Sequence, residues 1–368
     1  MFKTAIVHEW FVNYAGSERV VESFSNIWPE ADIFALVDFL NDEQRKIILK
    51  GKKVKTSFIQ NLPFAKNKHR YYLPLFPSAI ERLELSGFDI IVSSSHAVAK
   101  GFKKKNNQLH ITYCHSPMRY AWDQAEHYLH GFKGSIAKLF INYLRRWDLK
   151  SAQNVDYFIA NSHHIAEKIK RLYKTNAEVI YPPVDTDKFG VGNKKEDYYL
   201  TASRMVPYKK LDLVVKAFNQ MPDKKLIVIG SGPEKDKIKS IAASNIEIVG
   251  HLDREALKLF MQKAKAFVFA AEEDFGIIVV EAMACGTPVI ALNKGGSKES
   301  VINGITGILF EEQSSESIKD AVTQFDKQKS SFSPAAIRKH SEKFSRMVFE
   351  ENIKNFVSEK AQGFFPNK

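Results

Sequence analysis

The stretch E-D-F-G-I-I-V-V-E runs from Glu273 to Glu281, and A-M-A-C-G-T-P-V-I-A follows directly at 282–291. It predicts a loop with a carboxylate, a helix whose first turn holds Phe275–Ile277, and a turn into an apolar strand. Backbone N–H groups at a helix N-terminus bind anions, while the two glutamates can accept hydrogen bonds from hydroxyls. The pattern therefore fits a molecule with phosphate between two hydroxylated ends, such as a nucleotide-sugar.

Two simpler interpretations of the glutamates stay open at this point. They can be a surface pair flanking a core helix, or the acid and base of a hydrolase. Eight residues of continuous helix rise about 12 Å, whereas the paired carboxylates of glycosidases lie about 5 to 9.5 Å apart. The spacing does not favour hydrolysis.

The stretch resembles the donor-site signature of retaining glycosyltransferases of family four, Glu-x7-Glu continuing as A-M-A-x-G-T-P-V-I-A. The resemblance implies that Glu273 binds donor-sugar hydroxyls and Glu281 the ribose hydroxyls. Backbone N–H groups of Phe275, Gly276 and Ile277 would then hold the donor phosphates. It also implies the GT-B fold, in which two doubly wound α/β domains face a central cleft and the last helix crosses back onto the first domain.

Length and composition indicate the number of domains and the class of protein. A chain of 368 residues with 44% hydrophobic content favours two globular domains. No apolar run approaches the roughly 20 residues of a transmembrane helix, and His8 and Glu9 interrupt the start where a signal peptide would stay apolar. We therefore expect a cytoplasmic protein. Cys114 and Cys285 belong to no CxxC or Cys/His cluster, which argues against a disulfide framework or structural zinc.

The positive charge is concentrated in one region. Residues 45–105 hold 14 Lys/Arg and 3 Asp/Glu, a surplus of 11 in a chain of net charge +12. Within 53–77 the basic residues are interleaved with Phe, Tyr, Leu and Pro. Such a region is typical of a solvated face, of nucleic-acid binding, or of docking on an anionic membrane. Because the rest of the chain resembles a sugar enzyme, we favour docking at the inner face of the plasma membrane and expect no nucleic-acid partner.

Strands alternate with helices, which predicts parallel sheets. In the first half we expect strands at 4–8, 33–36, 90–93, 110–114 and 157–161, with helices at 17–27, 136–151 and 164–173. In the second half we expect strands at 198–203, 225–229, 246–249, 266–270 and 289–292, with helices at 211–220, 233–244, 253–263 and 276–284.

The segment Y-P-P-V-D-T-D-K-F-G at 181–190 marks a linker. It divides the chain into an acceptor-binding domain over 1–186 and a nucleotide-sugar-binding domain over 187–345. Phe349, Ile353 and Phe356 recur at helical spacing, so we expect residues 346–368 to form a helix that packs back on the first domain.

The segment S-R-M-V-P-Y-K-K at 203–210 follows an expected strand. Alone it is typical of a solvated basic turn. It resembles the family element G-R-L-x-x-x-K-G, which implies that Arg204 and Lys209 hold the donor diphosphate. Ser203 and Lys210 stand where that element has glycine, so the shape of the loop is not carried over.

Two further segments give weaker matches. Gly16 matches the second glycine of the family pattern Gly-Gly-Ala/Ser-Glu-Arg-Val, which implies a donor contact, although a turn before a helix capped by Ser17 explains it equally well. Leu252, in V-G-H-L-D-R-E-A-L, lies in a segment that resembles the one contacting the nucleotide base. A turn capped by Asp253 is an equally good interpretation.

The segment Y-C-H-S-P-M-R-Y-A-W-D at 113–123 resembles bacterial mannosyltransferases that assemble surface polysaccharides such as O-antigen and capsule. The resemblance implies that His115 contacts the donor sugar beside the bond that breaks. Arg119 and Asp123 have acceptor-side or structural roles in this interpretation. A lone histidine is also commonly structural.

Together these segments predict a retaining, metal-independent mannosyltransferase. GDP-mannose would be the co-substrate, without a further cofactor, and a polyprenyl-diphosphate-linked saccharide the acceptor. The lack of a DxD triplet agrees with independence from metal. Two alternatives remain. One is another GT-B enzyme, such as a nucleotide-sugar epimerase or a phosphorylase. The other is a basic nucleic-acid-binding protein, which only the positive charge supports.

Overall fold

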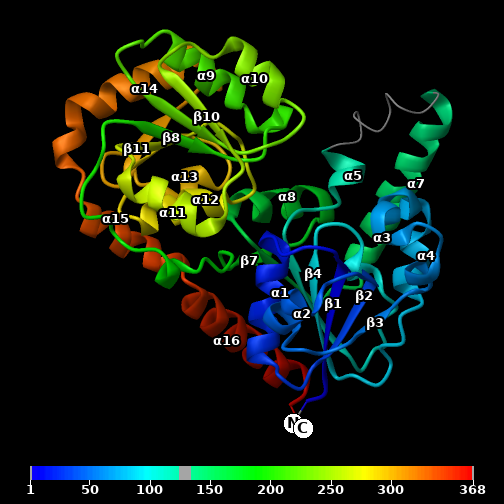
Figure 1. Cartoon of the computed structure of the whole chain (residues 1–368). Helices are drawn as coiled ribbons and strands as arrows, with labels where there is room; N and C mark the ends of the chain where they lie inside the picture. Colours follow the sequence, from blue (N-terminus) through cyan, green and yellow to red (C-terminus); the bar gives the residue numbers. More distant parts are fainter. Residues whose placement is uncertain (1, 124–133, 367–368) are drawn as a thin grey trace. The chain divides into compact units, whose positions relative to one another are not determined.

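The computed structural model describes residues 2–123 and 134–366 (Figure 1). The chain divides into two compact units, one made of 1–183 with 349–368 and the other of 184–348. The chain first crosses between the units at Pro183/Val184, inside the segment that the sequence marks as a linker. It crosses back at Val348/Phe349, within the last helix.

The first unit is built on a seven-stranded parallel sheet, ordered β3-β2-β1-β4-β5-β6-β7. Its strands are β1 (Thr4–Phe11), β2 (Asp32–Asp38), β3 (Val54–Thr56), β4 (Ile90–Ser95), β5 (Leu109–Cys114), β6 (Tyr157–Ala160) and β7 (Ala177–Val179). Its helices are α1 (Gly16–Ile27), α2 (Asp42–Leu49), α3 (Ala65–Lys68), α4 (Phe76–Glu81), α5 (Arg119–Trp122), α7 (Gly134–Ala152) and α8 (His163–Tyr173).

The central strands of this sheet are buried on both faces. Alternate residues of a strand point to opposite faces, and on β1 Ala5 and Val7 enter one core cluster while Ile6 enters another. Strands of a sheet covered by helices on both sides are apolar on both faces, and the short apolar segments 5–7 of β1 and 90–92 of β4 make these strands recognisable in the sequence.

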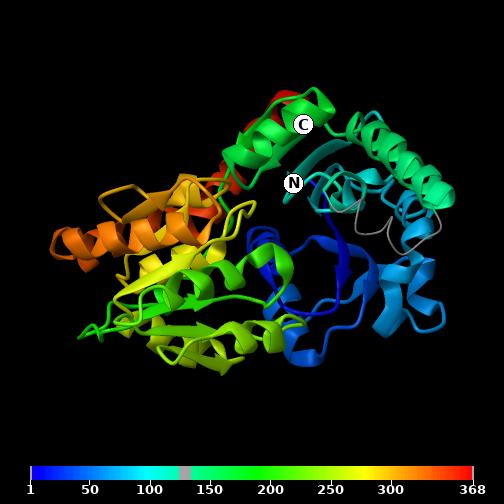
Figure 2. The ribbon, with the colours of Figure 1, turned by 90° about the horizontal axis from the view of Figure 1, so that it is seen from above.

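The last helix, α16 (Arg346–Phe364), completes one of these two clusters. The Phe349 ring lies 6.2 Å from the Phe24 ring and 5.5 Å from the Tyr113 ring. Near the ends of the chain the Phe2 and Phe365 rings are 4.8 Å apart, and the termini lie close together in both views (Figures 1 and 2). The buried residues of the helix recur every four positions: Phe349, Ile353, Val357 and Ala361.

The second unit is built on a six-stranded parallel sheet, ordered β10-β9-β8-β11-β12-β13. Its strands are β8 (Tyr199–Ala202), β9 (Leu226–Ile229), β10 (Ile246–Gly250), β11 (Ala266–Phe269), β12 (Val289–Leu292) and β13 (Gly307–Phe310). Its helices are α9 (Leu211–Asn219), α10 (Lys235–Ile241), α11 (Arg254–Lys263), α12 (Ile277–Ala284), α13 (Ser297–Ser300), α14 (Ser315–Gln328) and α15 (Pro334–Ser341).

Both units share one topology. Counted from its own first strand, each sheet begins 3-2-1-4-5-6, the order of a Rossmann fold, so the expected α/β fold class is confirmed. The strand order reverses between β1 and β4 in the first unit and between β8 and β11 in the second. Ligands of such sheets bind beyond the carboxyl ends of the strands at this reversal.

Several expectations about local structure need correction. Helix α1 begins at Gly16 with Ala15 as its N-cap, so Ser17 is not the cap. Gly276 has φ +84° and stands outside the helix, which begins at Ile277. The helix expected at 233–244 spans only Lys235–Ile241, because Ala242 is extended. Several strands and helices were not predicted from the sequence, notably β3, β7, β13, α2, α14 and α15.

Candidate functional site

In the second unit the strand reversal brings together two charged residues expected in the donor site. Glu273 follows β11, and Lys209 ends a short 3₁₀ turn, Pro207–Lys209, that follows β8. The Lys209 ammonium forms an ion pair with the Glu273 carboxylate. Arg204 also follows β8 and is exposed, without a hydrogen bond or ion pair from its guanidinium to any described residue. This edge of the sheet therefore carries one exposed cation, Arg204, and a Lys209–Glu273 pair whose side chains are 16% and 20% exposed.

Two glycines hold the loop that carries Glu273. The Gly296 N–H donates to the Glu273 carbonyl at 2.8 Å. A Cβ at Gly295 would lie 2.3 Å from that carbonyl oxygen, and one at Gly296 would lie 2.2 Å from the Phe275 Cα. Such distances exclude any side chain, so the loop position depends on the adjacent glycines.

A second glycine pair shapes the loop that carries Arg204. A Cβ at Gly230 would lie 1.9 Å from the Ser203 carbonyl oxygen, and one at Gly232 would lie 2.4 Å from that of Met205. Both glycines have positive φ, +147° and +154°. The turn at 230–234 therefore packs directly against the backbone on either side of Arg204, a role that the sequence reading did not assign to it.

The expected anion site lies at the start of α12. The N-cap residue, Gly276, has a left-handed conformation and makes no side-chain cap hydrogen bond. The Phe275 side chain is buried, with its ring 5.6 Å from the Phe344 ring. Phe275, Gly276 and Ile277 can therefore contribute to a ligand site only through the backbone or, for Ile277, a partly exposed side chain.

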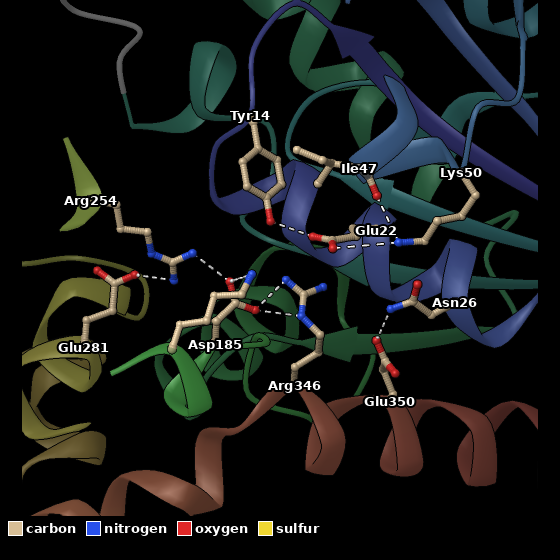
Figure 3. Close-up of polar contacts among 11 residues, drawn as sticks. Tyr14, Glu22, Asn26, Ile47, Lys50, Asp185, Arg254, Glu281, Arg346 and Glu350 are labelled. Carbon is tan, nitrogen blue, oxygen red and sulfur yellow. Dashed lines mark hydrogen bonds and ion pairs between the residues drawn. The ribbon is translucent and has the colours of Figure 1, made fainter. Parts of the chain in front are cut away.

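Glu281, on α12, is buried and belongs to a chain of charged groups (Figure 3). One terminal nitrogen of Arg254 donates a hydrogen bond to Glu281, with an N···O distance of 3.4 Å. The other terminal nitrogen donates to Asp185, with an N···O distance of 2.8 Å. Arg346 donates to the other oxygen of Asp185 at 2.7 Å. Burial opposes ionisation of Asp185, yet Arg346 and Arg254 hold the pKa of its carboxyl well below its usual range. Arg254, Asp185 and Arg346 were given no role by the sequence analysis.

Leu252 lies between β10 and α11 and is partly buried. The next residue, Asp253, caps α11 by accepting a hydrogen bond from the Ala256 N–H at 2.8 Å. The capped turn weighed for this segment is thus present. A contact between Leu252 and a base stays a prediction.

In the first unit His115 follows β5 and is almost fully buried. Its Nε2 lies 2.8 Å from the Ser94 hydroxyl, and its carbonyl accepts a hydrogen bond from Asn161. Burial, together with the nearby His96 and His8, holds the pKa of His115 well below its usual range. The imidazole is therefore neutral near pH 7, able to share a hydrogen bond but not to act as a cation.

Glu9 organises the same edge of the sheet, although the sequence reading assigned it no role. The carboxylate is fully buried, and one oxygen accepts hydrogen bonds from the Ser95 hydroxyl and the N–H groups of His96, Ala97 and Ala99 at 2.9 to 3.1 Å. Its other oxygen lies 3.1 Å from His96 Nδ1. Burial opposes ionisation, but these groups lower the pKa of Glu9 far below its usual value.

His8 links Glu9 to the turn at Gly16. Its Nδ1 lies 3.7 Å from Glu9 and its Nε2 lies 3.7 Å from Glu18. Burial opposes protonation, yet these two carboxylates raise the pKa of His8. Glu18 in turn accepts the Ala15 N–H at 3.1 Å. Gly16 thus begins a helix anchored to the buried cluster, and its donor contact stays a prediction.

Arg119 and Asp123 begin and follow the short helix α5. Asp123 forms an ion pair with Lys168 of α8, whose ammonium also lies 3.4 Å from the Ser116 hydroxyl. This pairing gives Asp123 a structural partner. Acceptor contacts by Arg119 and Asp123 stay predictions.

The basic region carries a patch of exposed aromatic side chains. Phe64 is 78% exposed and Tyr71 is 76% exposed. The Lys68 ammonium lies 6.0 Å from the Phe64 ring and 5.7 Å from the Tyr71 ring. Among the described residues, no helix has the length and apolar composition needed to cross a membrane.

Comparison with known proteins gives matches along most of the chain. Residues 15–188 match the family model Glycosyltransferase Family 4, and residues 184–344 match Glycosyl transferases group 1. An uncharacterized glycosyltransferase of Methanocaldococcus jannaschii is 31% identical over 204 residues, which cover 53% of this chain and 56% of that protein.

A GDP-mannose-dependent phosphatidylinositol monomannoside mannosyltransferase of Mycolicibacterium smegmatis is 31% identical over 39% of this chain and 46% of its own length. The chain thus matches about half the length of these curated relatives. Among solved structures, the Anabaena protein HepE in complex with UDP aligns with a TM-score of 0.70 at 16% identity, covering 97% of this chain and 100% of that chain. That likeness concerns the fold alone.

Proposed function

The chain belongs to the family-four glycosyltransferases of the GT-B class, and from this premise we propose that it is a retaining mannosyltransferase. It would move mannose from GDP-mannose to a lipid-linked saccharide in the assembly of surface polysaccharide. The observation that carries the proposal is the Lys209–Glu273 pair, which precedes α12 and its N-cap residue, Gly276. It joins a phosphate-binding cation and a hydroxyl-binding carboxylate at the strand reversal of the second unit.

In the proposed reaction the bond from the sugar C1 to the diphosphate oxygen breaks. Arg204, Lys209 and the backbone N–H groups around Gly276 stabilise the negative charge that develops on the diphosphate. The acceptor oxygen bonds to C1 from the same face, and its proton passes to the departing phosphate oxygen. No dedicated carboxylate base and no metal ion take part in this scheme.

The remaining residues position the donor. Glu273 accepts hydrogen bonds from sugar hydroxyls and Glu281 from the ribose, while Leu252 lies against the base and Gly16 lets the donor approach the backbone. His115, being neutral, serves as a hydrogen-bond partner of the donor sugar. It would not supply positive charge to the leaving group.

The choice of GDP-mannose rests on two similarities. The segment at 113–123 resembles mannosyltransferases of surface-polysaccharide assembly, and the Mycolicibacterium relative is named for its dependence on GDP-mannose. The Anabaena structure holds UDP instead, so an experiment must separate the two bases.

Thermal stabilisation by GDP-mannose and by UDP-glucose tests the donor, because a ligand that binds only the folded chain raises its melting temperature. We expect a shift with GDP-mannose and a smaller one with UDP-glucose. A larger shift with UDP-glucose would overturn the choice of donor. No shift with any nucleotide-sugar would reject the transferase function.

Release of GDP from GDP-mannose then tests the reaction. We expect release to depend on an added polyprenyl-diphosphate-linked saccharide and the product to keep the anomeric configuration of the donor. Conversion of the donor without acceptor would instead indicate an epimerase.

We also propose that the patch around Phe64 and Tyr71 docks on the anionic inner face of the plasma membrane. Exposed aromatic rings can enter the interfacial layer while Lys66, Lys68 and Arg70 face lipid phosphates. Each basic residue near the surface contributes about 1 kcal/mol. The nucleic-acid alternative lacks any further supporting motif.

Sedimentation with vesicles tests this docking. The wild-type chain should bind vesicles that contain phosphatidylglycerol, lose most binding at high salt, and bind weakly to phosphatidylcholine alone. The variant Phe64→Ser/Tyr71→Ser should bind less, with Tyr208→Ser, which alters an exposed aromatic residue of the second unit, as its control. Binding that is insensitive to salt and to lipid charge would contradict the proposal.

A further inference from the structure

Glu281 is held by residues that come from distant parts of the second unit. Arg254 belongs to α11, and Asp185 is the second residue after the first crossing between the units. Arg346 opens α16, just before the return crossing. The four side chains form one continuous series of ion pairs, Glu281–Arg254–Asp185–Arg346 (Figure 3).

Arg254 is fixed by its neighbours on several sides. Its two terminal nitrogens are divided between Glu281 and Asp185, and its charged group lies 5.1 Å from the centre of the Phe189 ring. Its Nε is buried without a hydrogen-bond partner among the described residues. A planar guanidinium held in this way has little freedom to turn, so its nitrogen next to Glu281 has a defined position.

Asp185 is the anchor of the series. Its side chain is 2% exposed, and each of its two oxygens contacts a different arginine. The backbone around it is fixed as well, because the Val184 N–H donates to Phe344 and the Arg346 N–H donates to Val184, both at 3.0 Å. The two crossing segments are thus hydrogen-bonded to each other next to Asp185.

The helix that carries Glu281 is attached to the same segment at its other end. The Arg338 guanidinium donates to the carbonyls of Thr186, Phe189 and Ala284 at 2.6 to 3.1 Å. Ala284 is the last residue of α12. The Glu281 side chain and the C-terminus of its helix are therefore connected to residues 185–189 through Arg254 and Arg338, respectively.

We propose that Asp185 and Arg254 are positioning residues for Glu281, which they hold in the orientation that accepts hydrogen bonds from the ribose of the nucleotide. This inference rests on the proposed function, which places the ribose at Glu281. Asp185 contacts Glu281 only through Arg254. The geometry of the ribose site then depends on the segment where the chain crosses between its units.

The test compares GDP with 2′,3′-dideoxy-GDP, and UDP with 2′,3′-dideoxy-UDP, by calorimetric titration of the full chain. The ratio of the two dissociation constants reports how much the ribose hydroxyls contribute. For the base that binds more tightly we expect a ratio of about tenfold or more in the wild type, since hydrogen bonds to a charged group are strong. In Arg254→Lys and Asp185→Asn the ratio should fall to about twofold.

Two further variants separate positioning from other effects. Lys188→Met removes another cation near Asp185, 3.4 Å away and mostly exposed, and should keep the wild-type ratio. Adding Arg254→Lys to Glu281→Gln should change the ratio no further than Glu281→Gln alone. If Asp185→Asn fails to fold, the ratios of dissociation constants for Arg254→Lys and for this double variant still test the positioning role of Arg254.

The outcomes are distinct. Equal weakening of both forms of the nucleotide by Arg254→Lys would mean that Arg254 binds phosphate directly, and it would overturn the inference. A wild-type ratio near one would remove Glu281 from the ribose and overturn it too. If the wild type binds neither GDP nor UDP, the proposed function itself fails.

Discussion

The carboxyl edges of the two sheets occupy the same place in the same topology but carry charge differently. In the first unit Glu9, His8 and Glu18 are buried and contact one another. In the second unit Arg204 is exposed, and the partly exposed Lys209 and Glu273 form an ion pair. The buried charges serve to fix loops, whereas charges near solvent can exchange their partner for a ligand. Topology thus indicates where a site lies, and burial separates the charges that fix loops in the first unit from Arg204, Lys209 and Glu273, which are accessible to a ligand.

The largest expected effect concerns the buried carboxylate. Glu9→Ala should lower the free energy of unfolding by about 3 to 5 kcal/mol, because the buried donors at 95–99 lose their acceptor and His8 loses one of its two neighbouring carboxylates. Glu273→Ala, the matched change at a partly exposed carboxylate, should cost less, about 1 to 2 kcal/mol. Urea denaturation measures the free energy of unfolding of both variants. Similar losses would contradict the different roles given to the buried and the partly exposed carboxylate.

The second effect is on catalysis. Glu273→Gln should lower kcat with GDP-mannose about a hundredfold, or roughly 2.7 kcal/mol of transition-state stabilisation, while the melting temperature changes little. His115→Ala should also lower kcat, whereas Glu281→Ala should mainly raise the donor KM. Unchanged donor kinetics in all three variants would remove these residues from the donor site.

The third effect is the dependence of stability on pH. Burial lowers the pKa of His110 to about 3, whereas an unfolded histidine titrates near 6.5. Below pH 6.5 the unfolded chain binds a proton that folded His110 does not, so stability falls as the pH falls, by roughly 2 kcal/mol at pH 5. The lowered pKa of His115 acts in the same direction.

His8 behaves oppositely, because its pKa is raised. Its contribution is complete below pH 6.5 and is lost as the pH rises through its folded pKa, so it does not cancel the loss in acid. Urea denaturation at pH 7 and pH 5 should show a smaller difference for His110→Gln than for the wild type. An equal difference would show that His110 does not contribute to the acid sensitivity of the first unit.

The smallest effect concerns Asp123. Asp123→Asn breaks a partly exposed pair with Lys168 and should cost at most about 1 kcal/mol of stability. The measurement that separates its two interpretations is the KM for the saccharide acceptor. A raised acceptor KM with unchanged donor KM would assign Asp123 to the acceptor, and unchanged values for both would leave it structural.

The sequence was most informative where local pattern and structure coincide. Strands such as β4 and β5 are buried along their whole length and contain short apolar segments, and the donor-site segment is contiguous from Glu273 to Glu281. The short edge strands β3 and β7 have only three residues each and little burial. They lack the pattern that identifies a strand.

The residues to which the sequence analysis gave no role have partners that lie far away along the chain. Glu9 looked like a polar interruption near the end of a strand, because its partners at 95–99 lie more than 80 residues away. Asp185 looked like part of a polar linker, since Arg254 and Arg346 meet it only in the folded unit. One signal was available: several polar residues follow neighbouring strands of one sheet, which predicts that they cluster.

The return of α16 to the first unit has a consequence for the order in which the protein is made. Phe349 packs on Phe24 and Tyr113, yet it is translated about 165 residues after the rest of the first unit ends at Pro183. At 5 to 20 residues per second the ribosome needs roughly 10 to 30 s for that interval. Over this time the apolar surface awaiting α16 stays uncovered, while residues 184–348 emerge as one uninterrupted segment. The unit that comes second in the sequence is thus the first that can be completed during synthesis.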